Sequence, residues 1–178
     1  MAAAVRAVRR RPPTALEVVV LADTHLRHGL DGLPDRVIRA VRGAGVVLHA
    51  GDLTSPNALA ELRGCAETHA VLGNNDLELR AALPEDLVLE LAGVTVALVH
   101  DAGPARGRAA RLQRRFPTAG VVVFGHSHVP LVEEGREGQL LFNPGSPTQR
   151  RRQPHATFGR LLLADGVVRG RWIEIATV

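Results

Sequence analysis

Residues 17–25 read EVVVLADTH, a short run of β-branched residues followed directly by a polar cluster. A run of this kind with polar boundaries is typical of a buried β-strand. Similar arrangements recur at residues 46–52, 69–76, 94–101 and 120–128. Because polar side chains that follow the strands of an α/β sheet gather at their carboxyl ends, this repetition predicts both the fold and the place of a site.

The segments between these strands predict helices. Residues 34–42 form the first, with Pro34 near its first position and Gly43 as its stop. The second runs from Ser55-Pro56 to about Arg63, with Ser55 as its N-cap. A third covers residues 105–116. These helices alternate with the first strands in the order β-α-β-α-β.

Hairpins and a β-rich last third complete the expected order. Residues 87–91 and 94–99 flank Ala92-Gly93, which indicates a hairpin. Further strands are predicted at residues 129–133, 139–142, 157–163 and 167–175, with Asp165-Gly166 as the turn between the last two. No glycine-rich dinucleotide fingerprint follows the first strand, so the doubly wound Rossmann pattern is excluded. The order instead predicts an α/β fold of two packed sheets with helices outside.

Length and composition favour one domain. The chain has 178 residues, 46% of them hydrophobic, which is enough for a sizeable core. Its single cysteine, Cys65, cannot form an internal disulfide, which fits a reducing compartment and a cytoplasmic location. No apolar run reaches the roughly 18 residues of a membrane span, so we expect no membrane association.

Positive charge is concentrated at the start of the chain. All 22 basic residues are Arg, and four of them, at positions 6, 9, 10 and 11, lie in a segment without acids. We therefore expect residues 1–15 to form a basic, flexible tail and residues 16–178 to form the domain. The domain carries equal numbers of Arg and acidic residues and few aromatic ones, which argues against a nucleic-acid-binding face.

The polar clusters hold seven candidate metal ligands without a thiolate: Asp23, His25, Asp52, Asn74, His100, His126 and His128. Mixed oxygen and nitrogen donors suit Mn, Fe or Zn and are too rich in His for Ca or Mg. Seven donors suit two ions ~3.5–4 Å apart that share a carboxylate. In D-x-H and H-x-H, residues two apart along extended backbone point the same way. Glycines at positions 51, 73 and 125 permit tight turns there.

Each cluster alone has an ordinary explanation. Asp23 could cap a helix, Gly51-Asp52 could be a simple turn, and residues 74–76 have a good turn composition. A lone His100 would more often be a buried strand-end residue. It is the joint order, with each cluster placed after a buried strand, that favours a site.

The ordered series D-x-H, G-D, G-N-x-D, H and G-H-x-H resembles the calcineurin-like metallophosphoesterase superfamily over about residues 17–175. The short chain and the N-P-G-S at residues 143–146 are most similar to its small YfcE-like phosphodiesterase branch. This resemblance implies a two-sheet β-sandwich flanked by helices in a single domain. It also implies two metal ions at one edge of the sandwich, with Mn²⁺ expected and Fe, Zn and Ni as alternatives.

The resemblance also assigns roles to residues. One metal would take Asp23, His25 and His128, the other would take Asn74, His100 and His126, and Asp52 would bridge them. A hydroxide held between the ions would attack phosphorus, which makes the chain a metal-dependent phosphoesterase, most similar to phosphodiesterases. The residues expected to take part in catalysis are Asp52, Asn74, Asp76 and His100.

Two positions depart from the superfamily pattern. Asn75 stands where many members have a His that assists the leaving group, so weak activity is expected on esters with poor leaving groups. Asp76 then has a supporting or turn role. Asp101 stands where a Gly is usual, and either it orients His100 or it is a solvated turn residue.

Several further residues keep two interpretations. His49 is a support of the site or a buried structural His, and His28 lies near the site and could contact substrate. The arginines at 150–152 could bind phosphate or lie in a solvated loop. Residues 143–146 favour a fixed turn.

Alternative functions stay open. A nuclease would use the same metal chemistry, although the neutral domain disfavours nucleic acid. A protein-interaction scaffold of the same fold, like the retromer subunit, is the other alternative, and the intact set of donors argues against it. The expected partner is a small phosphoester substrate, and self-association is left open.

Overall fold

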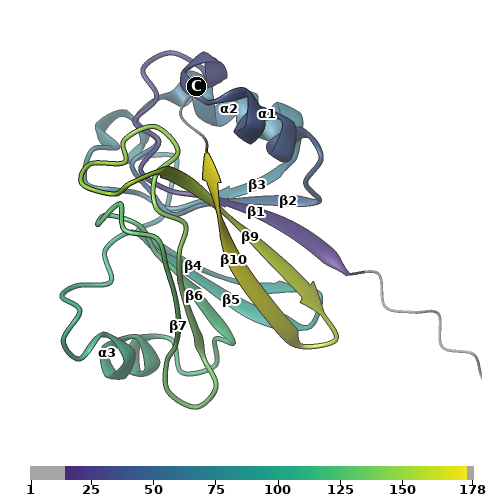
Figure 1. Ribbon diagram of the computed structural model, residues 1–178, viewed down its shortest axis with the longest axis vertical. Helices are drawn as coiled ribbons and strands as arrows, with labels where there is room; N and C mark the ends of the chain where they lie inside the picture. Colours follow the sequence, from purple (N-terminus) through teal and green to yellow (C-terminus); the bar gives the residue numbers. More distant parts are fainter. Residues whose placement is uncertain (1–14, 176–178) are drawn as a thin grey trace, which may run out of the picture.

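The computed structural model describes residues 15–175, and in them two five-stranded sheets pack face to face (Figure 1). The first sheet has the order β10-β9-β1-β2-β3. Its strands are β1 (Leu16–Leu21), β2 (Val46–His49), β3 (Glu67–Ala70), β9 (Ala156–Ala164) and β10 (Val167–Ile175). The second sheet, in the order β4-β5-β6-β8-β7, has strands β4 (Asp86–Leu91), β5 (Val94–Val99), β6 (Val121–Val123), β7 (Leu131–Glu134) and β8 (Leu140–Asn143).

Helices cover the outer face of each sheet. Helices α1 (Asp35–Arg42) and α2 (Pro56–Cys65) lie on the first sheet, and α3 (Arg108–Arg115) lies on the second (Figure 1). The predicted N-cap of α2 is confirmed, because the Ser55 hydroxyl accepts a hydrogen bond from the Ala58 N–H. This is the expected two-sheet sandwich flanked by helices in one domain.

The central strands are apolar throughout because both of their faces are buried. In β1, Val18 and Val20 face the second sheet, whereas Val19 and Leu21 pack under α1 and α2. A strand covered on both faces needs a continuous apolar run rather than an alternating one. This packing explains the EVVVLA pattern of the sequence.

Strand direction determines where the polar clusters meet. Strands β1, β2 and β3 are parallel in one sheet, and β5, β6 and β8 are parallel in the other. The loops after their carboxyl ends gather at one end of the sandwich, on the left in Figure 1. The predicted order of strands and helices is therefore confirmed, together with both hairpins.

Some boundaries and local elements differ from the prediction. Strand β3 covers residues 67–70 rather than 69–72, because the Leu72 N–H leaves the β2 ladder and donates to the Pro84 carbonyl. Helix α3 begins at residue 108 because Gly107, with φ of 73°, interrupts a helix that was expected from residue 105. Two short 3₁₀ helices, η1 (Leu30–Gly32) and η2 (Leu77–Leu79), were not expected.

Two predictions concern the ends of the chain and membranes. The expected flexible tail at residues 1–15 lies outside the described residues, apart from residue 15. Within residues 15–175 no helix is long and apolar enough to cross a membrane.

Candidate metal centre

All seven candidate ligands meet at the end of the sandwich where the parallel strands finish. Each follows a strand: β1, β2, β3, β5 or β6. The side chains that meet there are Asp23, His25, Asp52, Asn74, His100, His126 and His128. The convergence expected from the order of the polar clusters is therefore present in the structure.

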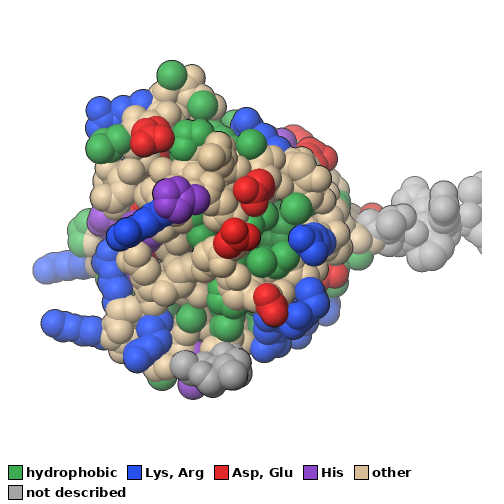
Figure 2. All heavy atoms as spheres, turned by 90° about the horizontal axis from the view of Figure 1, so that it is seen from above, with side chains coloured by type: hydrophobic (Ala, Val, Ile, Leu, Met, Phe, Trp, Pro, Cys, Tyr) green, Lys and Arg blue, Asp and Glu red, His purple; other side chains and the backbone are tan. Residues whose placement is uncertain are grey.

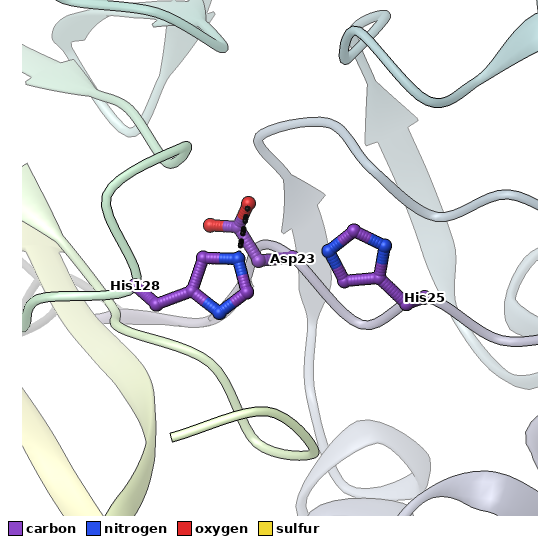
Figure 3. A group of neighbouring side chains, drawn as sticks. All are labelled: Asp23, His25 and His128. Carbon is purple, nitrogen blue, oxygen red and sulfur yellow. Dashed lines mark ion pairs between the residues drawn. The ribbon is translucent and has the colours of Figure 1, made fainter. Parts of the chain in front are cut away.

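Asp23, His25 and His128 form what we call the first group. Candidate ligand atoms of the three residues lie within 4.8 Å of one another, and the Asp23 carboxylate lies between the two imidazoles (Figure 3). His128 Nε2 is 3.4 Å from Asp23 Oδ1. The two imidazole rings have centroids 5.5 Å apart. One carboxylate and two imidazoles thus face a common point.

Asp52 connects this first group to a second group, formed by Asn74, His100 and His126. Asp52 Oδ2 is 3.6 Å from His25 Nε2 and 3.6 Å from His100 Nε2. The Asn74 amide oxygen lies 3.1 Å from His100 Nε2 and 3.0 Å from His126 Nδ1. Asp52 therefore lies between the two groups, within 3.6 Å of a ring nitrogen in each.

Backbone carbonyls orient two of the imidazoles. His100 Nδ1 donates to the Ala50 carbonyl at 2.8 Å, and His128 Nδ1 donates to the Gln149 carbonyl at 2.6 Å. With the proton on Nδ1, Nε2 of each neutral ring presents a lone pair to the centre. This is the tautomer that binding of a metal through Nε2 requires.

Several buried polar atoms of the first group have no hydrogen-bond partner. They are both Asp23 carboxylate oxygens, His25 Nε2 and His128 Nε2. A buried polar atom without a partner costs about 1–3 kcal/mol, and more when it is charged. A cation bound at this point would satisfy all of them at once. The donor set therefore fits a divalent metal ion.

Burial disfavours charge in the first group. Burial, and secondly the nearby Asp52 carboxylate, raise the pKa of Asp23 to about 8. Burial also lowers the pKa values of His25 and His128, so both rings are neutral at pH 7. Neutral imidazoles can bind a metal, whereas the Asp23 carboxylate needs a nearby cation to stay ionised.

Asp52 has the opposite electrostatic environment. Burial alone would raise its pKa, but hydrogen bonds from Asn75 and the proximity of His100 and His25 lower it overall. The Asn75 N–H donates to Oδ1 at 2.8 Å, and the Asn75 side-chain amide donates to Oδ2 at 2.6 Å. Asp52 is thus held as a carboxylate between the two groups.

Asp76 binds backbone rather than the centre. Its buried carboxylate accepts N–H groups from Asp52, Thr54 and Gly73, at 2.7 to 2.9 Å. These bonds tie the loop after β2 to the loop after β3. The geometry fits the supporting or turn role considered for this residue.

The backbone at the centre is strained. Five of the seven candidate ligands have positive φ, between 45° and 67°: Asp23, His25, Asp52, His126 and His128. The expectation of extended backbone in D-x-H and H-x-H is therefore wrong. Non-glycine residues in this region cost about 1–3 kcal/mol each, and such residues cluster at functional sites. The two pairs reach the centre through backbone in the left-handed region.

Two glycines allow the loops to approach this closely. Gly51 has φ of 87°, and a Cβ there would lie 2.6 Å from His100 Nδ1. A Cβ on Gly73 would collide with the backbone nitrogen and Oδ1 of Asp52. The close packing expected at these positions is present.

The loop after β8 holds the first group in place. Asn143 and Gly145 form the predicted turn, in which the Gly145 N–H donates to Asn143 Oδ1 at 2.8 Å. The Ser146 hydroxyl then donates to the Asp23 carbonyl, also at 2.8 Å.

Two residues beyond this turn were missed by the sequence analysis. The Thr148 hydroxyl donates to the Thr24 carbonyl at 2.8 Å, and the Gln149 carbonyl accepts from His128. The contacts join residues more than 20 positions apart, so no local pattern could reveal them.

The remaining candidates lie around the centre. His49 is fully buried and its Nε2 lies 2.9 Å from the Thr24 hydroxyl, so it is a buried His that supports the loop carrying Asp23 and His25. Asp101 is exposed and accepts the Gly103 N–H at 2.6 Å, which makes it a turn residue, and the Ala50 carbonyl orients His100 instead.

Two hollows open beside the centre. The wide hollow, of about 660 Å³, is lined by the second group and by residues that include Arg80, Asp101 and Arg115. The narrow hollow, of about 420 Å³, is lined by His25 of the first group and by residues that include Arg27, His28, Thr148 and Gln149. Each group of ligands therefore has its own hollow.

Known proteins share the sequence pattern of this chain. The calcineurin-like phosphoesterase superfamily domain matches residues 16–166. A probable metallophosphoesterase of Methanothermobacter thermautotrophicus is 37% identical over 131 residues, which cover 72% of this chain and 76% of that protein. A probable metallophosphoesterase of Methanocaldococcus jannaschii is 33% identical over 132 residues, which cover 72% of this chain and 67% of that protein.

Solved structures share the fold. A predicted phosphoesterase from Streptococcus pneumoniae has a TM-score of 0.70 at 24% identity, covering 90% of each chain. Vps29 of Entamoeba histolytica, solved in complex with Zn²⁺, has a TM-score of 0.68 at 24% identity, covering 89% of this chain and 99% of that one. At these identities the likeness concerns the fold.

The sequence match extends over most of the described residues, and it includes every strand end that carries a candidate ligand. Together with the two archaeal relatives, it makes the relationship plain. The chain belongs to the calcineurin-like phosphoesterase superfamily.

Proposed function

We propose that this chain is a phosphodiesterase that uses two divalent metal ions, with Mn²⁺ as the expected ion. The observation that carries the proposal is the cluster of unpartnered donors: both Asp23 oxygens, His25 Nε2 and His128 Nε2 are buried and face one point. Asp52 and the second group lie next to these donors: Asp52 is 3.6 Å from His100, and the Asn74 amide oxygen is 3.1 Å from His100 and 3.0 Å from His126.

The two groups would each hold one ion. Asp23, His25 and His128 would hold the first, Asn74, His100 and His126 would hold the second, and Asp52 would be shared. When bound, two such ions lower the pKa of water and offset negative charge on a phosphoryl group, which favours attack on phosphorus at neutral pH.

The chain itself supplies orientation and charge at defined atoms. The Ala50 and Gln149 carbonyls fix the Nδ1–H tautomers of His100 and His128. Asn75 keeps Asp52 ionised and prevents its carboxylate from rotating. Strained turns hold the ligands in this geometry before any ion or substrate arrives.

The residues at positions 75 and 76 do not supply a general acid for the leaving group. The position next to Asp76 is the neutral Asn75, whose side chain is bonded to Asp52. The Asp76 carboxylate is buried and bonded to backbone N–H groups. We therefore infer a preference for phosphoesters whose leaving groups depart without protonation.

The two hollows favour diesters over monoesters. A phosphodiester carries two substituents, and a phosphoryl group at the centre would have the wide hollow on the side of Asn74, His100 and His126 and the narrow hollow on the side of His25. A monoester would fill only one of them. A diester therefore gains contacts from both hollows.

Nucleic acid is a less suitable substrate. Figure 2 shows one face of the molecule, on which Arg side chains lie mainly at the edges while acidic and apolar side chains occupy the middle, so no basic stripe crosses this face. Extended binding of a nucleic-acid backbone requires such a stripe, together with aromatic residues for stacking. A nuclease is thus the second enzymatic candidate.

A protein-interaction scaffold is the non-enzymatic candidate. It is favoured by fold likeness to Vps29 of Chaetomium thermophilum, solved with a cyclic peptide, at a TM-score of 0.66 and 16% identity. The complete and strained ligand set of this chain favours an enzyme, because strain of this kind destabilises the fold and is found mainly at functional sites.

The proposal is tested by hydrolysis of a bis-aryl phosphodiester and of the matching aryl monoester, with Mn²⁺ at neutral to mildly alkaline pH. We expect turnover of both, a higher kcat/KM for the diester, and none by Asp52→Asn. An oligonucleotide substrate tests the nuclease alternative in the same assay. Absence of diester hydrolysis by the Mn²⁺-loaded protein would refute the proposal.

A further inference from the structure

Helix α3 begins with an arginine whose side chain has no polar partner. Within residues 15–175 the Arg108 guanidinium makes no hydrogen bond or ion pair, and its Nε is buried. Arg111, in the next turn, instead donates to the Ala102 and Pro104 carbonyls and holds the loop before the helix. A buried donor without an acceptor costs free energy, so Arg108 points to a ligand.

The guanidinium of Arg108 has a defined place. Its Cζ lies 5.1 Å from the centroid of the Phe124 ring, which is the distance of a cation–π contact. Phe124 is buried, and its N–H donates to the Phe142 carbonyl at 2.9 Å, so the ring is held by the core. Arg108 is thus fixed at the end of β6, where the loop that carries His126 begins.

A small pocket opens at this place. Its volume is about 30 Å³, enough for one or two water-sized groups. Its lining includes Asp101, Arg108, Phe124, Gly125, His126 and Ser127. Asp101 and His126 also line the wide hollow. The small pocket therefore adjoins the wide hollow.

One wall of the small pocket belongs to the metal centre. His126 is a candidate ligand of the second group, and its Nδ1 lies 3.0 Å from the Asn74 amide oxygen. Gly125 packs so closely on the first group that a Cβ there would lie 2.9 Å from Asp23 Oδ2. Arg108 thus lines the same small pocket as residues that hold or touch both groups.

Ser127 brings a second donor to the small pocket. Its Oγ accepts from the Val129 N–H at 3.3 Å and from the Asn143 side-chain amide at 3.2 Å. The Ser127 O–H itself has no acceptor in the part of the chain that the structure describes. Asp101 accepts the Gly103 N–H and forms no ion pair with Arg108 among those residues. Two unpaired donors, one of them cationic, suit an oxygen atom of an anion.

We propose that Arg108, together with the Ser127 hydroxyl, binds a non-bridging phosphoryl oxygen of the substrate on the side of the second group. The inference rests on the proposed function and assigns two residues to the recognition of the phosphate. The small pocket cannot hold a whole phosphate, so one oxygen enters it while the phosphorus stays in the wide hollow. A guanidinium there offsets negative charge on the phosphoryl group.

The test measures binding of inorganic phosphate to the Mn²⁺-loaded protein by isothermal titration calorimetry. Arg108→Met keeps an unbranched apolar stem over Phe124 and removes the charge and the donors. We expect its phosphate affinity to fall roughly 10- to 100-fold, the value of a charge-assisted hydrogen bond. The matched control is Arg114→Met at an exposed position of α3, for which we expect affinity close to that of the wild type.

A second measurement separates phosphate binding from a structural role. Mn²⁺ affinity without phosphate should be close to that of the wild type in Arg108→Met, because Arg108 bonds none of the seven candidate ligands in the described chain. An arginine that merely held the loop of His126 in place would weaken Mn²⁺ binding and phosphate binding together. Loss of Mn²⁺ affinity in this variant would therefore overturn the assignment.

Asp101→Asn tests the competing idea that Arg108 acts through an ion pair with Asp101. The variant keeps an oxygen for the Gly103 N–H and removes a negative charge from the lining of the small pocket. We expect phosphate affinity equal to or higher than that of the wild type, because a repulsive charge is lost. A loss as large as that in Arg108→Met would overturn the proposal.

Other results also decide against the inference. Wild-type phosphate affinity in Arg108→Met, an equal loss in Arg114→Met, or no phosphate binding by the wild type would each overturn it. The proposed function fails separately: phosphate binding that depends on Arg108, without hydrolysis of any diester, would leave the phosphate site standing and refute the enzyme.

Discussion

Asn75 donates to both carboxylate oxygens of Asp52, from its backbone N–H at 2.8 Å and from its side-chain amide at 2.6 Å. The position at which many superfamily members have a His is therefore occupied here by a residue that holds the shared carboxylate. These two bonds lower the pKa of Asp52 against the effect of burial. Asn75 acts on the centre through Asp52.

Replacement of Asn75 by Ala should weaken metal binding. The variant keeps the backbone donor but loses the amide, so the Asp52 carboxylate becomes freer to rotate and its pKa rises. We expect Mn²⁺ affinity to fall about tenfold, as is usual when a residue that orients a metal ligand is removed. Asn57→Ala, a change at an exposed position of α2, is the matched control for calorimetric titration. Equal affinities in the two variants would contradict the role of Asn75.

Replacement of Asn75 by His should change leaving-group preference. An imidazole at this position can protonate a departing alkoxide but cannot reproduce the amide bond to Asp52. We expect the ratio of kcat/KM for an alkyl phosphodiester to that for a bis-aryl one to rise, while bis-aryl turnover falls. An alkyl to bis-aryl ratio of kcat/KM equal to that of the wild type would contradict the claim that Asn75 leaves the site without an acid for the leaving group.

The charge state of Asp23 predicts a pH-dependent effect in the metal-free protein. Its pKa is about 8 in the folded chain against an ordinary 3.8, so the folded state holds a proton that the unfolded state loses between these values. The contribution of Asp23 to stability without metal should therefore decrease as pH rises from about 4 to 8.

Asp23→Asn removes this dependence. In chelator at pH 8 the variant should unfold several degrees above the wild type, a gain of roughly 1–3 kcal/mol, and the gap should shrink towards pH 4. Added Mn²⁺ should stabilise the wild type more than the variant, which keeps only the ligands of the second ion intact. A lower melting temperature for metal-free Asp23→Asn at pH 8 would contradict the unfavourable burial of this carboxylate.

His49 predicts the opposite trend at acidic pH. Burial lowers its pKa from 6.5 to about 3, so between these values the unfolded chain binds a proton that the folded chain excludes. This contribution to stability is complete above pH 6.5 and is lost as pH falls towards 3. Urea unfolding of metal-free His49→Gln should therefore show a smaller loss of stability from pH 7 to pH 4.5. If the free energy of unfolding falls equally in the variant and the wild type between pH 7 and pH 4.5, His49 takes up a proton in the folded chain and the prediction is wrong.

Much of the sandwich could be predicted because its signals are local. The apolar run of β1, the Ser55-Pro56 start of α2 and the Asp165-Gly166 turn each depend on a few adjacent residues. The convergence of the ligands was also predictable, because parallel strands with polar ends bring those ends together. The lengths of the apolar runs and the order of the elements were sufficient to predict both the sandwich and the convergence of its polar strand ends.

Long-range contacts explain what the sequence did not reveal. The positive φ of Asp23 and His128 is stabilised by residues far along the chain, such as Ser146 and Gln149, which bond to the Asp23 and His128 positions. The end of β3 is determined by a hydrogen bond between Leu72 and Pro84. No pattern within a short window carries such information.

The central claim is that two ions share Asp52, and the most direct measurement is the metal content of the protein at saturation. Purified wild-type protein is equilibrated with excess Mn²⁺ and separated from free metal. Its manganese content per chain is then measured by inductively coupled plasma mass spectrometry. We predict two ions per chain, with a clear loss in Asp52→Asn, because that variant lacks the shared carboxylate. Saturation of the wild type at one ion per chain, or full loading of Asp52→Asn, would contradict the claim.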